Sequence, residues 1–210
     1  MKTAIVTGVA GFIGSSLAER LLKNKFKVVG IDNFTKYYPK KIKLNNIKSF
    51  RKNENFSLLT KDILNVDLRA IFNKAEFLFH LAAQPGVRAS WGKDFEKYSK
   101  NNIHATQKLL EYAKNSKTIK KIVLASSSSV YGIQDGKMNE SKTNTEPVSP
   151  YGVSKLAVEH LAKAYVKNFN SPIVMLRYFT VYGPRQRPDM AFMKFIMKSL
   201  RKKPITIYGN

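Results

Sequence analysis

Tyr151 and Lys155 are residues whose types and spacing suggest chemistry. Side chains four residues apart lie on one face of a helix, so these two are expected to be neighbours. A lysine ammonium beside a phenol favours the phenolate and is expected to lower the tyrosine pKa from about 10. A tyrosine tuned in this way can act as a general base and acid. Such pairs are common in helices, so the meaning of this one depends on the rest of the chain.

A glycine-rich turn near the N-terminus predicts a dinucleotide site. Gly8, Gly11 and Gly14 directly follow one predicted strand and open a predicted helix. Glycines allow a tight turn and let backbone N–H groups approach a pyrophosphate at the positive end of the helix. Asp32 follows the second predicted strand, where its carboxylate can accept hydrogen bonds from the adenine ribose and repel a 2′-phosphate. The pattern therefore favours NAD over NADP.

Four serines, Ser126–Ser129, follow the fifth predicted strand. In an open α/β sheet the carboxyl ends of the strands face the ligand crevice. Hydroxyl groups at that position can hydrogen-bond a substrate oxygen. A serine-rich turn without any binding role is the alternative, especially for Ser126 and Ser129.

Short apolar runs alternate with longer amphipathic segments, which predicts βαβ units and a doubly wound parallel sheet of the Rossmann type. The predicted strands are Ala4–Thr7, Lys27–Ile31, Phe56–Leu59, Phe77–Leu81, Lys121–Ala125, Ile173–Arg177 and a last short one, Ile205–Tyr208. The predicted helices are Phe12–Leu22, Asn101–Asn115, Pro150–Phe169 and Ala191–Lys202. We expect His80 to pack at the end of its strand, and the following apolar residues to lie in the core: Trp91, Phe192, Met193, Phe195, Ile196 and Met197.

Composition restricts the classes of protein. The chain has 210 residues, 43% of them hydrophobic, no cysteine and three histidines without ligand spacing, so thiolate chemistry is excluded and we expect no metal site and a reducing cytoplasm. Neither a signal peptide nor a membrane span is expected, since glycines interrupt the apolar N-terminal stretch and no apolar run approaches about 18 residues. The net charge of +23 is spread along the chain, so we expect a solvated lysine-rich surface with no nucleic-acid or membrane partner.

Taken together, these motifs resemble the extended short-chain dehydrogenase/reductase family, in its NAD-dependent nucleotide-sugar epimerase/dehydratase branch. Further segments match that branch: the segment HLAAQPGVR (80–88), the pair Asn101-Asn102 and the segment RYFTVYGPRQRPDM (177–190). The resemblance covers essentially the whole chain, and it is strongest to UDP-glucuronate 4-epimerases.

The resemblance implies a mechanism and a set of site residues. Tyr151 would take the proton from the sugar 4-hydroxyl, Lys155 would lower its pKa and bind the nicotinamide ribose, and Ser127 would hold the reacting oxygen. Hydride would pass from C4 to NAD⁺ and return to the opposite face of a transient 4-keto sugar. The implied cofactor-binding residues are Gly8, Gly11, Phe12, Ile13, Gly14, Asp32, Asn33, Phe34, Asp62, Ile63, Leu81, Ala82, Ala83, Asn102, Tyr151, Lys155 and Tyr178.

The implied substrate-binding residues are Arg88, Ser127, Ser128, Thr180 and Arg185. A 4-keto glucuronate is a β-keto acid that can lose CO₂, and our hypothesis is that Arg185 holds its carboxylate where the breaking bond is poorly aligned. Ser128-Ser129 replace the Asp-Glu pair of the dehydratases, which argues against dehydration. UDP-N-acetylglucosamine or UDP-glucose 4-epimerase, UDP-glucuronate decarboxylase and a non-catalytic NAD-binding module remain alternatives.

We expect two parts. Residues 1–180 would form the NAD-binding domain with the catalytic residues, and residues 181–210 would begin a substrate-binding domain. Relatives of this kind are longer than this chain, so a truncated chain is expected, whose own activity is open. The complete protein is expected to be a homodimer.

Overall fold

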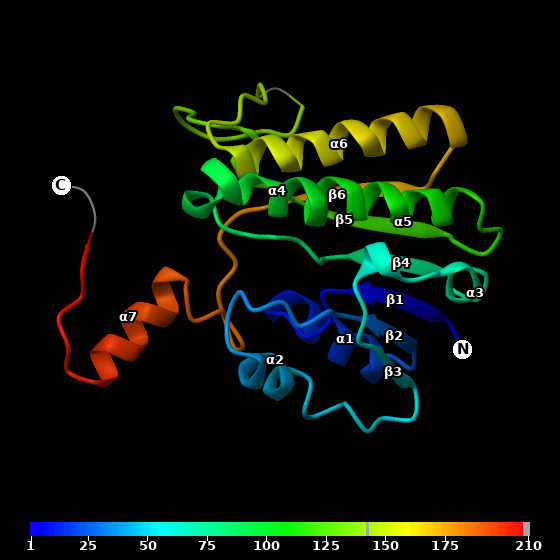
Figure 1. The fold of residues 1–210 in the computed structure, drawn as a ribbon, viewed down its shortest axis with the longest axis horizontal. Helices are drawn as coiled ribbons and strands as arrows, with labels where there is room; N and C mark the ends of the chain where they lie inside the picture. The colour runs from blue at the N-terminus through cyan, green and yellow to red at the C-terminus, as the bar shows by residue number, and fades with distance from the viewer. Residues whose placement is uncertain (142, 208–210) are drawn as a thin grey trace.

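A computed structural model describes residues 1–141 and 143–207. Six strands form one sheet in the order β3-β2-β1-β4-β5-β6, and every neighbouring pair is parallel (Figure 1). The strands are β1 (Thr3–Thr7), β2 (Lys27–Ile31), β3 (Phe56–Leu59), β4 (Phe77–His80), β5 (Lys121–Ser127) and β6 (Ile173–Tyr178). The strand order reverses between β1 and β4, so the carboxyl ends of these two strands form the topological switch point at which ligands bind. The predicted doubly wound Rossmann-type fold is confirmed.

The helices alternate with the strands. They are α1 (Phe12–Lys23), α2 (Lys40–Asn46), α3 (Arg69–Phe72), α4 (Phe95–Tyr98), α5 (Ala105–Lys114), α6 (Pro150–Phe169) and α7 (Ala191–Leu200). Three of the short ones, α2, α3 and α4, were not predicted. A π-helical segment, Ser99–His104, joins α4 to α5 and includes the start of the predicted helix Asn101–Asn115.

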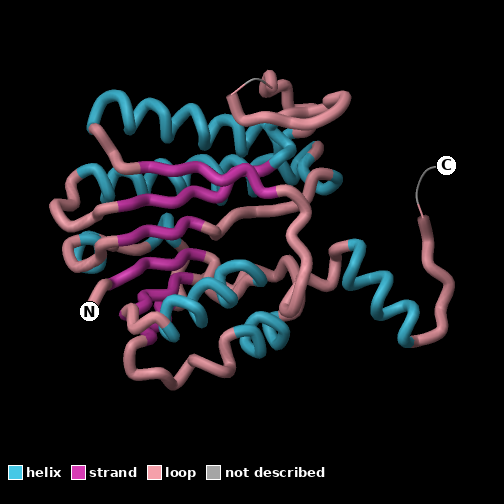
Figure 2. The backbone as a smooth tube through the Cα atoms, turned by 180° about the vertical axis from the view of Figure 1, so that it is seen from behind, coloured by secondary structure: helices cyan, strands magenta, loops and turns pink. Residues whose placement is uncertain are grey.

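Alternate side chains of the strands enter two separate cores. On one face, Ile5 of β1 and Leu78 of β4 belong to the cluster that also includes buried residues of α3, α5 and α6. On the other face, Ala4 and Val6 pack with α1 and the segment that follows α2. Seen from behind, α1 lies in front of the sheet, whereas α5 and α6 lie beyond it (Figure 2). Both faces of the sheet are thus covered, as its apolar strands require.

The limits of α6 follow from local chemistry. The Ser149 hydroxyl oxygen accepts a hydrogen bond from the Gly152 N–H at 3.1 Å, and Pro150 occupies the first turn. Asn170 ends the helix in the left-handed conformation at φ 50°. These signals place Tyr151 in the first turn of α6.

The C-terminal segment differs from the sequence-based expectations. α7 stands apart from the sheet in Figure 1, and none of its residues is buried. The apolar residues of α7 that were expected in the core are therefore not core residues, although the Tyr182 ring lies beside Phe192 with centroids 5.5 Å apart. Trp91 is also exposed, at 63%, since it lies on a surface turn between two single-turn helices. The predicted strand is wrong for residues 205–207, which form no ladder, and Tyr208 lies outside the described residues.

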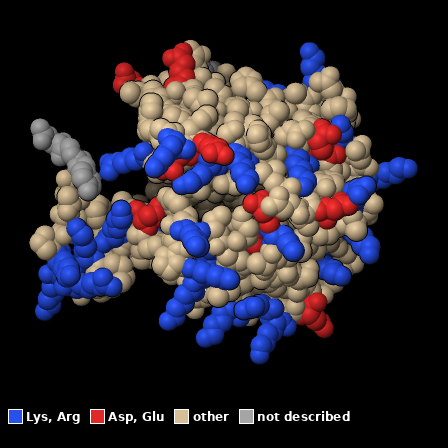
Figure 3. Space-filling view, viewed as in Figure 1, with Lys and Arg blue, Asp and Glu red and all other residues tan. Residues whose placement is uncertain are grey.

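Lysines and arginines are scattered over the face shown in Figure 3, with the densest groups over α2 and its flanking segments and on α7. Acidic residues are interspersed on the same face, mostly on its upper and middle parts. The absence of a nucleic-acid partner stays a prediction. None of the helices in the described ranges has the length and apolar character needed to cross a lipid bilayer.

Candidate active site

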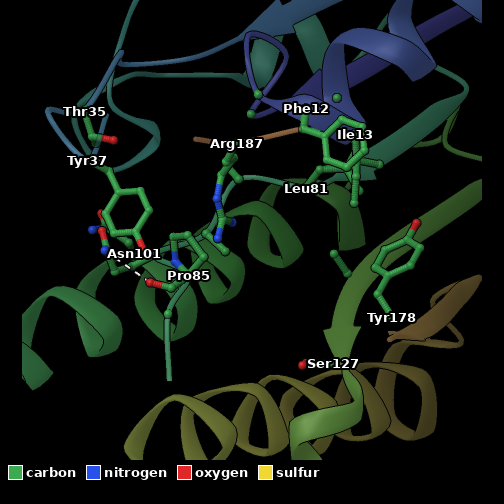
Figure 4. A pocket seen from close by; sticks show the side chains of 18 of the residues that line it. Phe12, Ile13, Thr35, Tyr37, Leu81, Pro85, Asn101, Ser127, Tyr178 and Arg187 are labelled. Carbon is green, nitrogen blue, oxygen red and sulfur yellow. Dashed lines mark hydrogen bonds between the residues drawn. The ribbon is translucent and has the colours of Figure 1, made fainter. Parts of the chain in front are cut away.

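A cleft of about 450 Å³ opens at the carboxyl ends of the strands. Its walls come from the glycine turn before α1, the ends of β2, β4, β5 and β6, the start of α6 and the loop after β6. Figure 4 shows Phe12, Ile13 and Leu81 in one part of the cleft and Tyr37 beside Arg187 in another. Ser127 and Tyr178 lie on the side formed by β5 and β6.

The glycine turn has the close backbone contacts that only glycine permits. A Cβ on Gly14 would lie 2.2 Å from the Gly8 carbonyl oxygen. Gly8 itself has φ +67°, and a Cβ there would lie 2.8 Å from the backbone nitrogen of Ala82. Gly11 caps α1 without a side-chain hydrogen bond, and the first turn of α1 contains no acidic residue. Free N–H groups at a helix N-terminus suit a pyrophosphate, so the turn fits the predicted dinucleotide.

The Asp32 carboxylate is held at the end of β2 by backbone donors. One oxygen accepts a hydrogen bond from the Ala10 N–H at 3.0 Å, and the other accepts one from the Phe34 N–H at 2.8 Å. These contacts fix the carboxylate beside the glycine turn, where an adenine ribose is expected. Asn33 lies next to it and donates a hydrogen bond to Asp62 at 3.3 Å.

Most residues predicted to hold the cofactor line the cleft. They are Gly8, Gly11, Phe12, Ile13, Gly14, Asp32, Asn33, Asp62, Ile63, Leu81, Ala82, Ala83, Tyr151, Lys155 and Tyr178. Phe34 and Asn102 are not among the lining residues. Phe34 is buried in the α1-side core at φ 52°, so only its backbone supports Asp32.

Asn102 supports the site from behind. Its amide oxygen accepts a hydrogen bond from the Gln84 N–H at 2.7 Å, and its NH₂ group donates to the Gln84 carbonyl at 3.2 Å and to the Ser154 hydroxyl at 2.9 Å. The Ser154 hydroxyl donates to the Tyr151 carbonyl at 2.7 Å. Asn102 therefore connects the loop after β4 to the first turn of α6.

The three predicted catalytic side chains come together on one wall. Tyr151 and Lys155 project from α6, and Ser127 ends β5. The Lys155 ammonium donates a hydrogen bond to the Ala125 carbonyl at 2.8 Å. The ring of Tyr98 meets that of Tyr151 edge to face, with centroids 6.1 Å apart.

The electrostatics of this wall differ from the sequence-based expectation. Burial raises the pKa of Tyr151, and the Ser127 hydroxyl and the Arg187 charge oppose that rise without cancelling it. Burial also lowers the pKa of Lys155 to about 8. Lys155 is thus held against Ala125 instead of acting directly on the phenol, and the expected lowering of the Tyr151 pKa is not found in this structure.

The substrate residues separate into two groups. Ser127, Ser128 and Thr180 line the cleft, whereas Arg88 and Arg185 do not. Arg185 has φ 72°, which turns its side chain toward α1, where the guanidinium pairs with Glu19 at 2.7 Å. Arg88 lies on an exposed helical turn.

Arg187 lines the cleft instead. Its guanidinium lies over the Tyr37 ring, 5.5 Å from the centroid, and bonds both Asp189 oxygens at 3.0 Å. Tyr37 in turn donates a hydrogen bond to Asp189 at 3.3 Å. Arg187 thus provides a cleft-lining cation in the motif in which Arg185 was predicted.

Sequence reasoning also missed the residues around α2. Tyr37, Tyr38 and Lys43 line the cleft, although the lysines were expected on a solvated surface. Lys43 is 5% exposed, and its ammonium donates to both oxygens of Thr35 at 3.0 and 3.2 Å. Burial and the nearby Asp32 carboxylate raise the pKa of Tyr38 to about 12. The adjacent pair Tyr37-Tyr38, surrounded by lysines, was the feature of the sequence that could have indicated a binding role for this segment.

Comparison with known proteins agrees with this geometry. Residues 4–210 match the model described as the NAD dependent epimerase/dehydratase family. The chain is 49% identical over 207 residues to an uncharacterized UDP-glucose epimerase of Bacillus subtilis, covering 98% of this chain and 65% of that protein. It is 41% identical over 209 residues to a UDP-glucuronate 4-epimerase of Thermodesulfobacterium geofontis, covering 98% and 64%. The chain therefore spans somewhat less than two thirds of the length of these relatives.

Solved structures give the same result. A UDP-glucuronic acid 4-epimerase from Bacillus cereus, in complex with UDP-glucuronic acid and NAD, superimposes with a TM-score of 0.95 at 52% identity, covering 100% of this chain and 66% of that one. A UDP-N-acetylglucosamine 4-epimerase from Methanobrevibacter ruminantium, in complex with UDP-N-acetylmuramic acid, has a TM-score of 0.89 at 34% identity, with the same coverage. These matches confirm the resemblance drawn from the motifs and the NAD dependence expected of such a protein.

Proposed function

Because the chain belongs to the NAD dependent epimerase/dehydratase family, we propose that it provides the NAD-binding and catalytic part of a UDP-sugar 4-epimerase. The observation that carries this proposal is the meeting of Ser127, Tyr151 and Lys155 in the cleft that also contains the glycine turn. A module that only binds NAD needs no such set of side chains.

The chain's own residues divide the work. Gly8, Gly14 and the start of α1 would hold the pyrophosphate, and Asp32 the adenine ribose. NAD⁺, when bound, supplies the hydride acceptor. Tyr151 would accept the proton of the sugar 4-hydroxyl and return it after the sugar has turned over, with Ser127 holding the reacting oxygen. Lys155 would donate a hydrogen bond to the nicotinamide ribose.

The substrate we propose is UDP-glucuronate, which would be converted to UDP-galacturonate. The relatives and structures named for UDP-glucuronate support this choice, with identities of 41% and 52%. Arg187 adds a local reason, since its guanidinium lines the cleft and lies close enough to influence the Tyr151 pKa. A guanidinium forms strong charge-assisted hydrogen bonds with a carboxylate or diphosphate.

A second candidate is an epimerase for UDP-N-acetylglucosamine, supported by the likeness to the Methanobrevibacter enzyme. Thr180 lines the cleft. The family resemblance implies that galactose-type epimerases usually have asparagine at this position. That difference favours glucuronate over UDP-glucose and UDP-N-acetylglucosamine.

The organisation of the whole protein follows from the same proposal. Residues 1–180 would be the cofactor domain and residues 181–210 the beginning of the substrate domain. The exposed apolar residues of α7 would then contact further parts of that domain. The complete protein would act as a homodimer in the cytoplasm.

The direct test incubates the protein with UDP-glucuronate and NAD⁺ and identifies the nucleotide sugar and any CO₂. A C4-inverted product without CO₂ is expected, and a Tyr151→Phe variant should form none. Release of CO₂ with a pentose product would instead indicate a decarboxylase. Parallel reactions with UDP-glucose and UDP-N-acetylglucosamine compare the candidate substrates.

A further inference from the structure

A buried ion pair lies immediately behind the proposed catalytic wall. The Arg177 guanidinium of β6 bonds both carboxylate oxygens of Glu159 on α6, at 2.9 and 2.8 Å. The Ser126 hydroxyl donates a third hydrogen bond to Glu159 at 2.6 Å. Glu159 is 1% exposed, and neither member of the pair lines the cleft. Such a pair is costly to bury, so its presence beside the site requires an explanation.

The pair belongs to a regular set of connections between β5 and α6. Tyr151, Lys155 and Glu159 follow one another at four-residue spacing, so they share one face of α6. Lys155 bonds the carbonyl of Ala125, and Glu159 accepts from the hydroxyl of Ser126. Tyr151 interacts with the hydroxyl of Ser127. Three consecutive strand residues are thus each joined to a different side chain on this face of α6.

Arg177 extends these connections to the neighbouring strand. It pairs in register with Ser126, and its guanidinium lies over the Tyr131 ring, 4.7 Å from the centroid. The next residue, Tyr178, pairs with Ser127 and lines the cleft. The ends of β5 and β6 and the face of α6 are therefore fixed at Glu159.

The charges also matter for Lys155. Although burial alone would raise the pKa of Glu159, the hydrogen bonds from Arg177 and Ser126 bring it below its ordinary value, so the group is a carboxylate. It lies one helical turn after Lys155, at the spacing at which side chains of one helix can meet. Both of its oxygens are occupied by Arg177, which leaves the Lys155 ammonium directed at Ala125.

We propose that Glu159 and Arg177 are positioning residues, which hold the Lys155 ammonium and the Ser127 hydroxyl in place around Tyr151. Arg177 does so by occupying the carboxylate that would otherwise attract Lys155. Neither residue contacts substrate or cofactor. This inference rests on the proposed roles of Tyr151 and Lys155.

The test compares Arg177→Met with the double variant Glu159→Gln/Arg177→Met. In the single variant the freed carboxylate attracts Lys155, and we expect kcat with UDP-glucuronate to fall at least tenfold while KM for UDP-glucuronate changes less than twofold. The Kd for NAD⁺ should rise, because Lys155 is drawn away from the nicotinamide ribose. Removing the carboxylate in the double variant should restore most of kcat. Arg69→Met is the matched control, since it breaks an exposed ion pair with Asp67. It should change none of kcat, KM and the Kd for NAD⁺.

A second readout does not depend on sugar turnover. Tyrosine labelled with ¹³C at Cζ reports the Tyr151 pKa by NMR titration, with the Tyr151→Phe variant assigning the signal. The groups that act on Tyr151 or contact it are Ser127, Arg187 and Tyr98, and Lys155 lies one turn further along α6. When Lys155 leaves the Ala125 carbonyl, the end of β5 that carries Ser127 loses this attachment. The Ser127 hydroxyl lowers the Tyr151 pKa, so that pKa should rise in Arg177→Met and return in the double variant. Thermal melting identifies any variant that fails to fold.

The outcomes separate this inference from the proposed function. An unchanged Tyr151 titration and kcat in folded Arg177→Met would overturn the positioning role. A double variant as impaired as the single one would also overturn it, since that result indicates loss of packing. If no UDP-sugar is turned over while the titration shifts and recovers, the positioning role stands and the proposed substrate is wrong.

Discussion

The ammonium of Lys155 lies 2.8 Å from the carbonyl oxygen of Ala125, so α6 is attached to the strand that ends in Ser127. Burial of this ammonium lowers its pKa from 10.5 to about 8. Because burial disfavours the charged ammonium, the protonated form of Lys155 destabilises the folded state. The proposed catalytic lysine is therefore expected to be retained for function at a cost in stability.

Replacing Lys155 should stabilise the protein while abolishing turnover. A shift from 10.5 to about 8 corresponds to about 3 kcal/mol, and loss of the bond to Ala125 offsets about 1 kcal/mol. We expect the free energy of unfolding of Lys155→Met, measured by urea denaturation at pH 7, to exceed that of the parent by about 1–2 kcal/mol. The unfolded lysine binds its proton up to pH 10.5 but the folded one only to about 8, so the parent gains stability as pH rises between these values. The advantage of the variant should shrink over that range, and a constant difference would contradict this account.

His80 predicts a different pH dependence. It is 4% exposed at the end of β4, with its ring nitrogens 2.7 Å from the Thr7 hydroxyl and 3.0 Å from the Thr106 hydroxyl. Burial lowers its pKa from 6.5 to about 3. Between pH 6.5 and 3 the His80 imidazole is protonated in the unfolded chain but not in the folded one. Stability is therefore lost as pH falls from 6.5 toward 3. This residue should contribute a loss of about 3 kcal/mol by pH 4.5.

His80→Gln removes the titrating group and should flatten the decline in urea midpoint between pH 6.5 and 4.5. His160 is exposed, so His160→Gln is the matched control and should leave the parent's pH dependence unchanged. Equal slopes for the parent and both variants would show that other groups govern acid unfolding.

The sheet could be predicted closely because parallel strands that are buried on both faces have short, continuous apolar sequences. β2 and β3 have the predicted bounds, and α6 does too, since Ser149 and Pro150 mark its start. Two short helices, α2 and α3, carry too few residues for a periodic pattern. The apolar residues of α7 were placed wrongly for a different reason. Hydrophobic character indicates that a side chain is stabilised by burial, but it does not identify the surface that buries it.

Most residues predicted to hold the cofactor line the cleft, because many of them lie at or just beyond the carboxyl ends of parallel strands, where an open α/β sheet binds ligands. The loop after β6 lacks that constraint. Arg185 and Arg187 are two residues apart, and the positive φ of Arg185 directs one guanidinium to Glu19, leaving the other in the cleft. A backbone conformation of that kind has no signature in the pattern of residue types.

The glycine turn gives a prediction about cofactor binding alone. In Gly14→Ala the new methyl group would meet the Gly8 carbonyl oxygen at 2.2 Å, so α1 must move away from the turn. We expect the Kd for NAD⁺, measured by calorimetry, to rise at least about tenfold, or about 1.4 kcal/mol. Gly136→Ala is the control. Gly136 has φ +84° with open space around it, so its substitution should cost about 1 kcal/mol of stability and leave NAD⁺ affinity unchanged.

The two arginines of the loop after β6 can be separated by their effects on substrate. Arg187 lines the cleft, so Arg187→Ala should raise the KM for UDP-glucuronate at least about tenfold, as expected when a charge-assisted hydrogen bond of about 1.5–3 kcal/mol is lost. Arg185 pairs with Glu19 at a partly exposed position, so Arg185→Ala should change KM less than about twofold and stability by less than about 1 kcal/mol. If Arg187 binds the sugar carboxylate, its loss should weaken UDP-glucuronate more than UDP-glucose and increase CO₂ release. Equal weakening would place the guanidinium on the diphosphate, and a larger effect from Arg185→Ala would support the arginine predicted from the sequence.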